Sequence, residues 1–208
     1  MGDSPLLIAA ASRPYPGESV SGDAWGADWR DGRCRIAVID GLGHGPAAAA
    51  AATQALAALA AEPALAPDAA LRRCHAALRH SRGAAMAVAW IDVPAARLVW
   101  AGVGNIEARL WNAGGGEWLA TDRGIVGAAM PRLHPIERRL AADWRLLIHT
   151  DGISNRFTLD ATCPAPDRLD DLVAGILARW GRATDDATVV AIAPRFIADE
   201  ARRGLRQG

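Results

Sequence analysis

The segment spanning residues 36–45, Ile-Ala-Val-Ile-Asp-Gly-Leu-Gly-His-Gly, brings an aspartate and three alternating glycines to the start of an alanine-rich stretch. The apolar run before Asp40 is typical of a buried strand bounded by glycine. Pro46 and the alanines after it predict a helix that begins at this point. The sequence thus places a carboxylate at a strand end beside a helix N-terminus, which suits a divalent cation and a phosphate.

Two nucleotide-binding interpretations of this glycine-rich turn are weaker. The dinucleotide pattern G-x-G-x-x-G needs its third glycine one residue later than Gly45, and an acidic residue at the end of a second strand. Glu62 has a comparable spacing, but it ends the predicted helix just before Pro63. A Walker loop is excluded because the chain contains no lysine. Taken alone, the segment also fits an ordinary tight turn.

Three further aspartates lie at comparable positions. Asp23 ends a Gly/Ser-rich segment, Asp151 follows the apolar run 146–148, and Asp185 precedes the apolar run 189–192. A single Asp-Gly is more often a turn than a ligand. Several carboxylates at strand ends, without a His or Cys cluster, favour hard cations such as Mg²⁺ and Mn²⁺, which prefer oxygen ligands and keep several waters.

Together these motifs resemble the PPM (PP2C-like) phosphatases of the SpoIIE branch, and among them the small stand-alone stressosome phosphatases. The matching segments occur in family order from about residue 20 to about residue 193. They are Ser21–Asp23, Val38–Gly45 with its helix, Arg82–Ala84, Trp100–Asn105, Ile148–Gly152 and Asp185–Thr188. The resemblance implies an α+β fold, a PP2C-like α-β-β-α sandwich of two antiparallel β-sheets flanked by helices.

The resemblance also implies a role for each acidic position. Asp40 would bridge two metal ions, Mn²⁺ or Mg²⁺, and the backbone carbonyl of Gly41 would bind one of them. Asp151 and Asp185 would hold the other ion, and Asp23 would complete the cluster directly or through water. Asp40, Asp151 and Asp185 are the expected catalytic residues, because two ions can activate a water for attack on a phosphate.

The sequence leaves open the roles of two other residues, His44 and Asp186. His44 either protonates the leaving oxygen or braces the loop and caps the following helix. The bracing role is favoured, since relatives place the acid directly after the metal-binding glycine, where this chain has Leu42. Asp186 is expected to lie behind the ligands, because distant relatives carry Asn at its position.

Apolar periodicity predicts the elements that must position these residues. Strands are expected at Leu6–Ala10, Arg35–Asp40, Ala85–Asp92, Arg97–Val103, Glu107–Trp111, Arg145–Thr150 and Thr188–Ala193, and helices at Ala47–Ala61, Asp68–His80 and Arg168–Trp180. Residues 85–111 predict a three-strand meander, and Gly114–Gly116 a hairpin turn. Clustered strands separated by a helix pair favour α+β layering over a doubly wound sheet.

The composition fits one compact enzyme domain, residues 1–194, followed by a polar, arginine-rich tail, residues 195–208. The 23 basic residues, all arginine, balance 23 acidic ones, so a nucleic-acid-binding surface is not indicated. Cys34, Cys74 and Cys163 are scattered, which is typical of free thiols in the cytoplasm. No segment is apolar enough to cross a membrane, and the N-terminus lacks a signal pattern.

The function implied by the resemblance is metal-dependent hydrolysis of phosphoserine or phosphothreonine in a protein. The expected substrate is a small STAS-domain regulator of a stress-response partner-switching module, that is, a phosphorylated anti-sigma antagonist or a stressosome protein. The alternative is a catalytically weak or inactive binding module on the same fold. The enzyme is expected to be a monomer, with substrate docking at the excursion Gly124–Pro135 and around Trp25 and Trp29.

Overall fold

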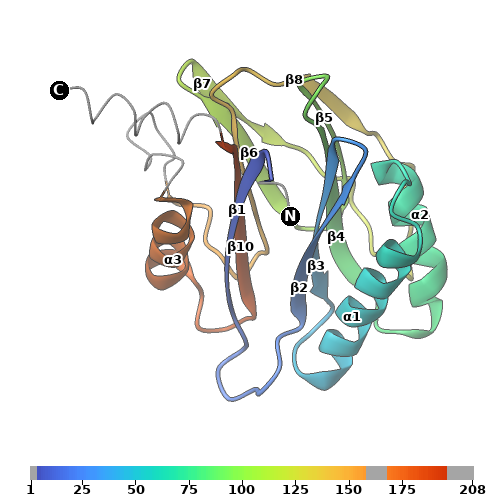
Figure 1. Cartoon of the computed structure of the whole chain (residues 1–208). Helices are drawn as coiled ribbons and strands as arrows, with labels where there is room; N and C mark the ends of the chain where they lie inside the picture. The colour runs from blue at the N-terminus through green and yellow to red at the C-terminus, as the bar shows by residue number, and fades with distance from the viewer. Residues whose placement is uncertain (1–3, 158–167, 196–208) are drawn as a thin grey trace.

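The computed structural model describes residues 4–157 and 168–195, in which two five-stranded antiparallel sheets face each other (Figure 1). The first sheet contains, in spatial order, β1 (Leu6–Arg13), β10 (Ala187–Pro194), β9 (Arg145–His149), β6 (Glu107–Asn112) and β7 (Gly115–Leu119). The second contains β2 (Asp23–Arg30), β3 (Arg33–Gly41), β4 (Ala84–Asp92), β5 (Arg97–Val103) and β8 (Ile136–Arg139). This confirms the predicted sandwich of two antiparallel sheets.

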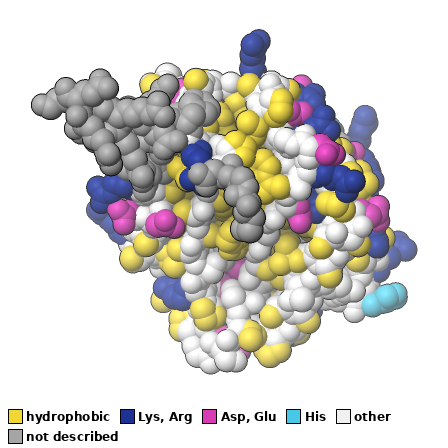
Figure 2. Space-filling view, in the orientation of Figure 1, with side chains coloured by type: hydrophobic (Ala, Val, Ile, Leu, Met, Phe, Trp, Pro, Cys, Tyr) yellow, Lys and Arg dark blue, Asp and Glu magenta, His cyan; other side chains and the backbone are white. Residues whose placement is uncertain are grey.

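Apolar side chains from the facing strands fill the space between the sheets. Val38, Trp100 and Ile148 are fully buried there, as alternation along each strand requires. Ile8 and Trp25 are only partly buried against this core. In Figure 2, hydrophobic side chains are visible along the front edge of the sandwich, between β1 and β2. The inter-sheet core therefore reaches the surface at this edge.

Helices cover the outer face of each sheet (Figure 1). α1 (Pro46–Ala61) and α2 (Pro67–Ala77), which continues as the short 3₁₀ helix η1 (Leu78–His80), pack on the second sheet, and α3 (Leu169–Trp180) packs on the first. The buried face of α1 is almost entirely alanine, so this helix can lie close to the strands. Among the described residues, no helix is long and apolar enough to span a membrane.

The predicted three-strand meander over residues 85–111 is wrong. β4 and β5 pair in the second sheet, but β6 lies in the first sheet, where it pairs with β7 and β9. The chain changes sheets at Gly104, whose φ is +96°, and Ile106 is buried between the sheets. Because strands of both sheets show the same alternation, periodicity alone does not reveal the sheet to which a strand belongs.

Three strands were not predicted, β2, β7 and β8, and all three are edge strands. Edge strands carry polar residues and glycine, which weakens the apolar pattern. The expected hairpin near Gly114 is confirmed, although Gly115 and Gly116 themselves pair with β6. Cys34 and Cys74 are free and buried, as expected. Cys163 and the predicted tail beyond Arg195 lie outside the described residues.

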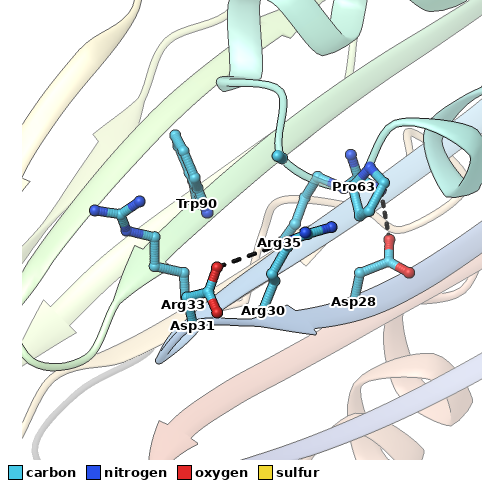
Figure 3. A pocket seen from close by; sticks show the side chains of 8 residues that line it. Asp28, Arg30, Asp31, Arg33, Arg35, Pro63 and Trp90 are labelled. Carbon is cyan, nitrogen blue, oxygen red and sulfur yellow. Dashed lines mark hydrogen bonds and ion pairs between the residues drawn. The ribbon is translucent and has the colours of Figure 1, made fainter.

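A buried arginine ties the start of β3 to the end of α1. Arg35 is 2% exposed and donates hydrogen bonds to the carbonyl oxygens of Leu59 (2.7 Å) and Glu62 (2.9 Å). It also forms an ion pair of 2.6 Å with Asp28. Arg35 and Asp28 line the small surface hollow of Figure 3, beside Trp90. The guanidinium adds a charged donor to two carbonyls at the C-terminal end of α1, one of which, Leu59, also accepts the N–H of Glu62, so it should stabilise this end of the fold.

Arg35→Met is expected to lower the free energy of unfolding by about 2 kcal/mol, because the two carbonyls at the end of α1 lose a charged donor and Asp28 loses its ion-pair partner. Urea denaturation followed by circular dichroism measures this change. Arg30→Met is the matched control, since Arg30 is exposed and, within the part of the chain that the structure describes, its only ion pair is with exposed Asp31. That control should change stability by less than about 0.5 kcal/mol. Equal unfolding midpoints for the two variants would show that Arg35 does not hold α1 in place.

Candidate metal centre

Four strand ends meet at one end of the sandwich. β3 ends at Asp40 and Gly41, β2 begins at Asp23, β9 leads into Asp151, and Asp185 precedes β10. Asp23 and Asp40 are direct cross-strand partners in the antiparallel β2–β3 pair. The loops β1–β2, β3–α1 and α3–β10 lie together at the lower end of Figure 1. The fold therefore gathers the four predicted aspartates, which are widely separated in sequence.

Hydrogen bonds from neighbouring side chains orient two of these carboxylates. The hydroxyl of Thr150 donates to Oδ2 of Asp23 over 2.7 Å. The amide Nδ2 of Asn105 donates to Oδ2 of Asp151 over 2.6 Å. These hydrogen bonds hold the two carboxylates in defined orientations within the cluster.

Asp186 is the most buried acidic residue of the group, at 2% exposure. Its Oδ1 accepts the backbone N–H of Tyr15 over 2.8 Å, whereas its buried Oδ2 has no hydrogen-bond partner among residues 4–157 and 168–195. Its backbone N–H donates to Oδ1 of Asp185 over 3.0 Å. An unpaired buried carboxylate oxygen carries a cost in free energy. A cationic group or an ordered water beside Oδ2 would offset this cost.

Two glycines allow the backbone to close around the aspartates. A Cβ on Gly41 would lie 2.3 Å from the carbonyl oxygen of Ala48, at the start of α1. A Cβ on Gly152 would lie 1.8 Å from the carbonyl oxygen of Asp186. No side chain fits at either position, which explains why Asp40 and Asp151 are each followed by glycine.

Burial and mutual repulsion act on the acidic cluster. Burial, with added repulsion from Asp23, Asp151, Asp185 and Asp186, raises the pKa of Asp40 to about 8. Burial also raises the pKa of Asp23 to about 7, although the hydrogen bonds it accepts oppose this rise. The pKa of Asp185 is raised by burial and by Asp151. Ionising the whole cluster therefore costs free energy, which a bound cation would offset.

The donor chemistry fits hard divalent cations, since all the gathered side chains are carboxylates. Among the described residues, no three His, Cys, Asp or Glu side chains converge closely enough to enclose an ion by themselves. A site in which a backbone carbonyl and water supply the other ligands agrees with this geometry, because Mg²⁺ usually keeps several waters. The residues therefore fit ions that are only partly coordinated by side chains.

His44 makes contacts of the bracing kind. Its Nδ1 lies 2.9 Å from Oε1 of Glu18, and its ring stacks on Tyr15 at a centroid distance of 4.2 Å. Glu18 also lies under Gly45, where a Cβ would approach its carboxylate within 2.8 Å. The β1–β2 loop is thereby fastened to the β3–α1 loop. These contacts support a structural role for His44.

The two expected docking segments have different positions. Trp29 is 39% exposed, but it lies at the opposite end of β2 from Asp23, six residues or roughly 20 Å away. Trp25 is partly buried against the inter-sheet core. The excursion Gly124–Pro135 does approach the centre, but it is not a plain surface loop. Val126 and Leu133 are buried in the same apolar cluster as side chains of α1 and α2.

Sequence reasoning gave no role to Tyr15, Thr150 or Asn105. Tyr15 and Thr150 reach their aspartate partners across 171 and 127 residues, so no local pattern could reveal these contacts. Asn105 stood inside a recognised motif, and the position of its side chain next to Asp151 is the new information.

The family model described as Stage II sporulation protein E (SpoIIE) matches residues 30–195. No curated protein gives a significant match. A solved structure from work on the bacterial stressosome, described as a modular system adapted to control secondary messenger signalling, is 30% identical. The match covers 90% of this chain and 98% of that chain, with a TM-score of 0.81.

Two further solved structures contain metal ions. RsbX in complex with magnesium is 18% identical, with coverage of 93% of this chain and 98% of that chain and a TM-score of 0.79. The catalytic domain of the serine/threonine phosphatase PstP, in complex with two manganese ions, is 20% identical, with coverage of 90% and 97% and a TM-score of 0.70. The chain therefore belongs to the SpoIIE family, and it has the PP2C-like phosphatase fold.

Proposed function

We propose that the aspartate cluster holds two divalent ions and that the chain uses them to hydrolyse phosphoserine or phosphothreonine in a protein. The general activity, that of a metal-dependent protein phosphatase, follows from the family and the fold. The proposed ligands are Asp23, Asp40, the carbonyl of Gly41, Asp151 and Asp185. The observation that carries this assignment is the meeting of four strand ends, where Asp40 is repelled by four other carboxylates.

The residues of the chain prepare the site for the ions. Asp40 occupies the electrostatic centre of the cluster, Thr150 orients Asp23, and Asn105 orients Asp151. When bound, two divalent ions supply an activated water and neutralise charge on the phosphoryl oxygens. Mn²⁺ or Mg²⁺ is the proposed cofactor, which is supported by the oxygen-only donor set and by the ions present in the PstP and RsbX structures.

The proposed substrate is a phosphorylated STAS-domain regulator, either an anti-sigma antagonist or a stressosome protein. The stressosome origin of the 30% identical structure supports this class of substrate. The proposed functional unit is the single domain of residues 1–194, acting as a monomer in the cytoplasm. Residues 195–208 are assigned no part in catalysis.

Incubation with phosphorylated STAS-domain proteins, with and without Mn²⁺, followed by intact-mass measurement, tests this function. The expected result is Mn²⁺-dependent loss of one phosphate from one candidate. Hydrolysis of para-nitrophenyl phosphate without action on any candidate would contradict the substrate class. If neither substrate is hydrolysed but a stable complex forms, the chain is an inactive binding module and the phosphatase proposal fails.

His44→Ala is expected to leave kcat for para-nitrophenyl phosphate within about threefold of wild type, since that leaving group needs little protonation. The same small change is expected for a phosphoserine protein, because His44 braces a loop. Steady-state kinetics on both substrates measure this. A selective loss of about 10²-fold or more on phosphoserine, with Mn²⁺ affinity unchanged, would instead make His44 the general acid.

A further inference from the structure

A cavity of about 490 Å³ opens beside the aspartate cluster. It is lined by Leu42, Ala85, Gly104, Asn105, Arg123, Gly124 and Ile125. Leu42 directly follows Gly41, and Asn105 donates its hydrogen bond to Asp151, so the cavity adjoins two of the proposed metal ligands. Its volume lies in the range of small-molecule pockets and is sufficient for one or two amino-acid side chains.

Hydrogen bonds fasten the wall of this cavity to the second sheet. The backbone of Asp122 pairs with Gly102 and Gly104, each over 2.9 Å. Val126 and Ala84 exchange two backbone hydrogen bonds of 2.9 and 3.0 Å. The segment between these two anchors carries Arg123 and Ile125. Because the wall is already ordered, a bound segment would lose little free energy to loop ordering.

The lining combines apolar side chains with one cation. Leu42, Ala85 and Ile125 supply the apolar part. The Arg123 side chain is exposed, and its neighbour Asp122 is already bonded to His134 through both its carboxylate oxygens (2.7 and 2.8 Å). Among the described residues, Arg123 has no carboxylate partner within 4.0 Å. A cation beside an acidic cluster can attract a carboxylate that the aspartates alone would repel.

We propose that this cavity binds the segment of the substrate protein that flanks its phosphorylated residue. A large apolar side chain next to the phosphorylated residue enters between Leu42 and Ile125, and an acidic side chain one position further pairs with Arg123. The inference rests on the proposed function, because the phosphate must sit at the aspartate cluster for its neighbour to reach the cavity. Arg123 is then a specificity-determining residue.

Synthetic phosphoserine peptides test this subsite with the Mn²⁺-loaded full chain. One series varies the residues after phosphoserine and another those before it, with Leu or Ala adjacent and Glu or Lys one position further. In one of the two series, the Leu-Glu peptide should exceed the Ala-Lys peptide in kcat/KM by about tenfold or more. Arg123→Glu should lower kcat/KM for the Glu-containing peptide by about tenfold and raise kcat/KM for the Lys-containing peptide. Turnover of para-nitrophenyl phosphate should stay within about twofold.

Arg132→Glu is the matched control, because Arg132 is exposed on the same excursion and does not line the cavity. This substitution should leave kcat/KM for every peptide unchanged. Equal kcat/KM across the peptides, or equal losses on peptides and aryl phosphate in Arg123→Glu, would overturn the subsite. Failure of the wild-type chain to hydrolyse even para-nitrophenyl phosphate would overturn the proposed function itself, so the two failures are distinguishable.

Discussion

Asp40→Asn is expected to lower Mn²⁺-dependent turnover of para-nitrophenyl phosphate by on the order of a thousandfold or more, while the protein stays folded. Asp40 lies opposite Asp23 and is repelled by four carboxylates, so its charge is the one best placed to attract both ions. Removal of that charge weakens the attraction for both ions together. Kinetics at a fixed, ordinary Mn²⁺ concentration measure the effect.

The controls separate the cluster from acidic residues elsewhere. Asp151→Asn and Asp185→Asn should cause similarly large losses, since both aspartates repel Asp40 or each other in the metal-free chain. Asp170→Asn should have no effect, because Asp170 is exposed on α3. Full activity in Asp40→Asn would remove the basis for the whole assignment. Circular dichroism must show that each variant is folded.

Metal-free protein is expected to lose stability as the pH rises from about 4 to about 8. The pKa of Asp23 rises from 3.8 to about 7 and that of Asp40 to about 8, chiefly through burial. Well below pH 3.8 both groups are protonated whether the chain is folded or unfolded. Between these limits the unfolded chain ionises freely while the folded chain keeps its protons, so the folded state is progressively disfavoured. The raised pKa of Asp23 alone corresponds to a loss of roughly 4 kcal/mol in the free energy of unfolding.

Thermal melts in EDTA from pH 5 to pH 9 measure this dependence. The Tm of wild type should fall toward high pH, and the Tm of Asp40→Asn should fall less, because one buried carboxylate is gone. Mn²⁺ should raise the Tm of wild type most at pH 8, where the cluster is ionised, and much less in Asp40→Asn. Equal Mn²⁺ stabilisation of both proteins at pH 8 would place the ion somewhere else.

The central strands and the acidic positions could be predicted from the sequence because they have local causes. The apolar run before Asp40, the Asp-Gly pairs and the alanine helix each leave a pattern within about ten residues. Gly41 and Gly152 explain part of this pattern, since no larger residue fits at either position. Asp23 was found as a candidate although its strand, β2, was not predicted.

The features that could not be predicted depend on contacts between distant parts of the chain. The placement of β6 in the first sheet is decided by its pairing with β9, which begins more than thirty residues later. The edge strand β2 is set by its pairing with β3, because its own sequence contains two aspartates and a glycine. The bond between Tyr15 and Asp186 joins the two ends of the domain.

The central claim is that the aspartate cluster binds two divalent ions, and anomalous X-ray scattering from crystals grown with Mn²⁺ tests it most directly. The account predicts two anomalous peaks beside Asp40, with Asp151 and Asp185 at one of them, and the loss of these peaks in crystals of Asp40→Asn. Peaks only at other positions, or no peaks in crystals of a chain that hydrolyses para-nitrophenyl phosphate, would contradict it.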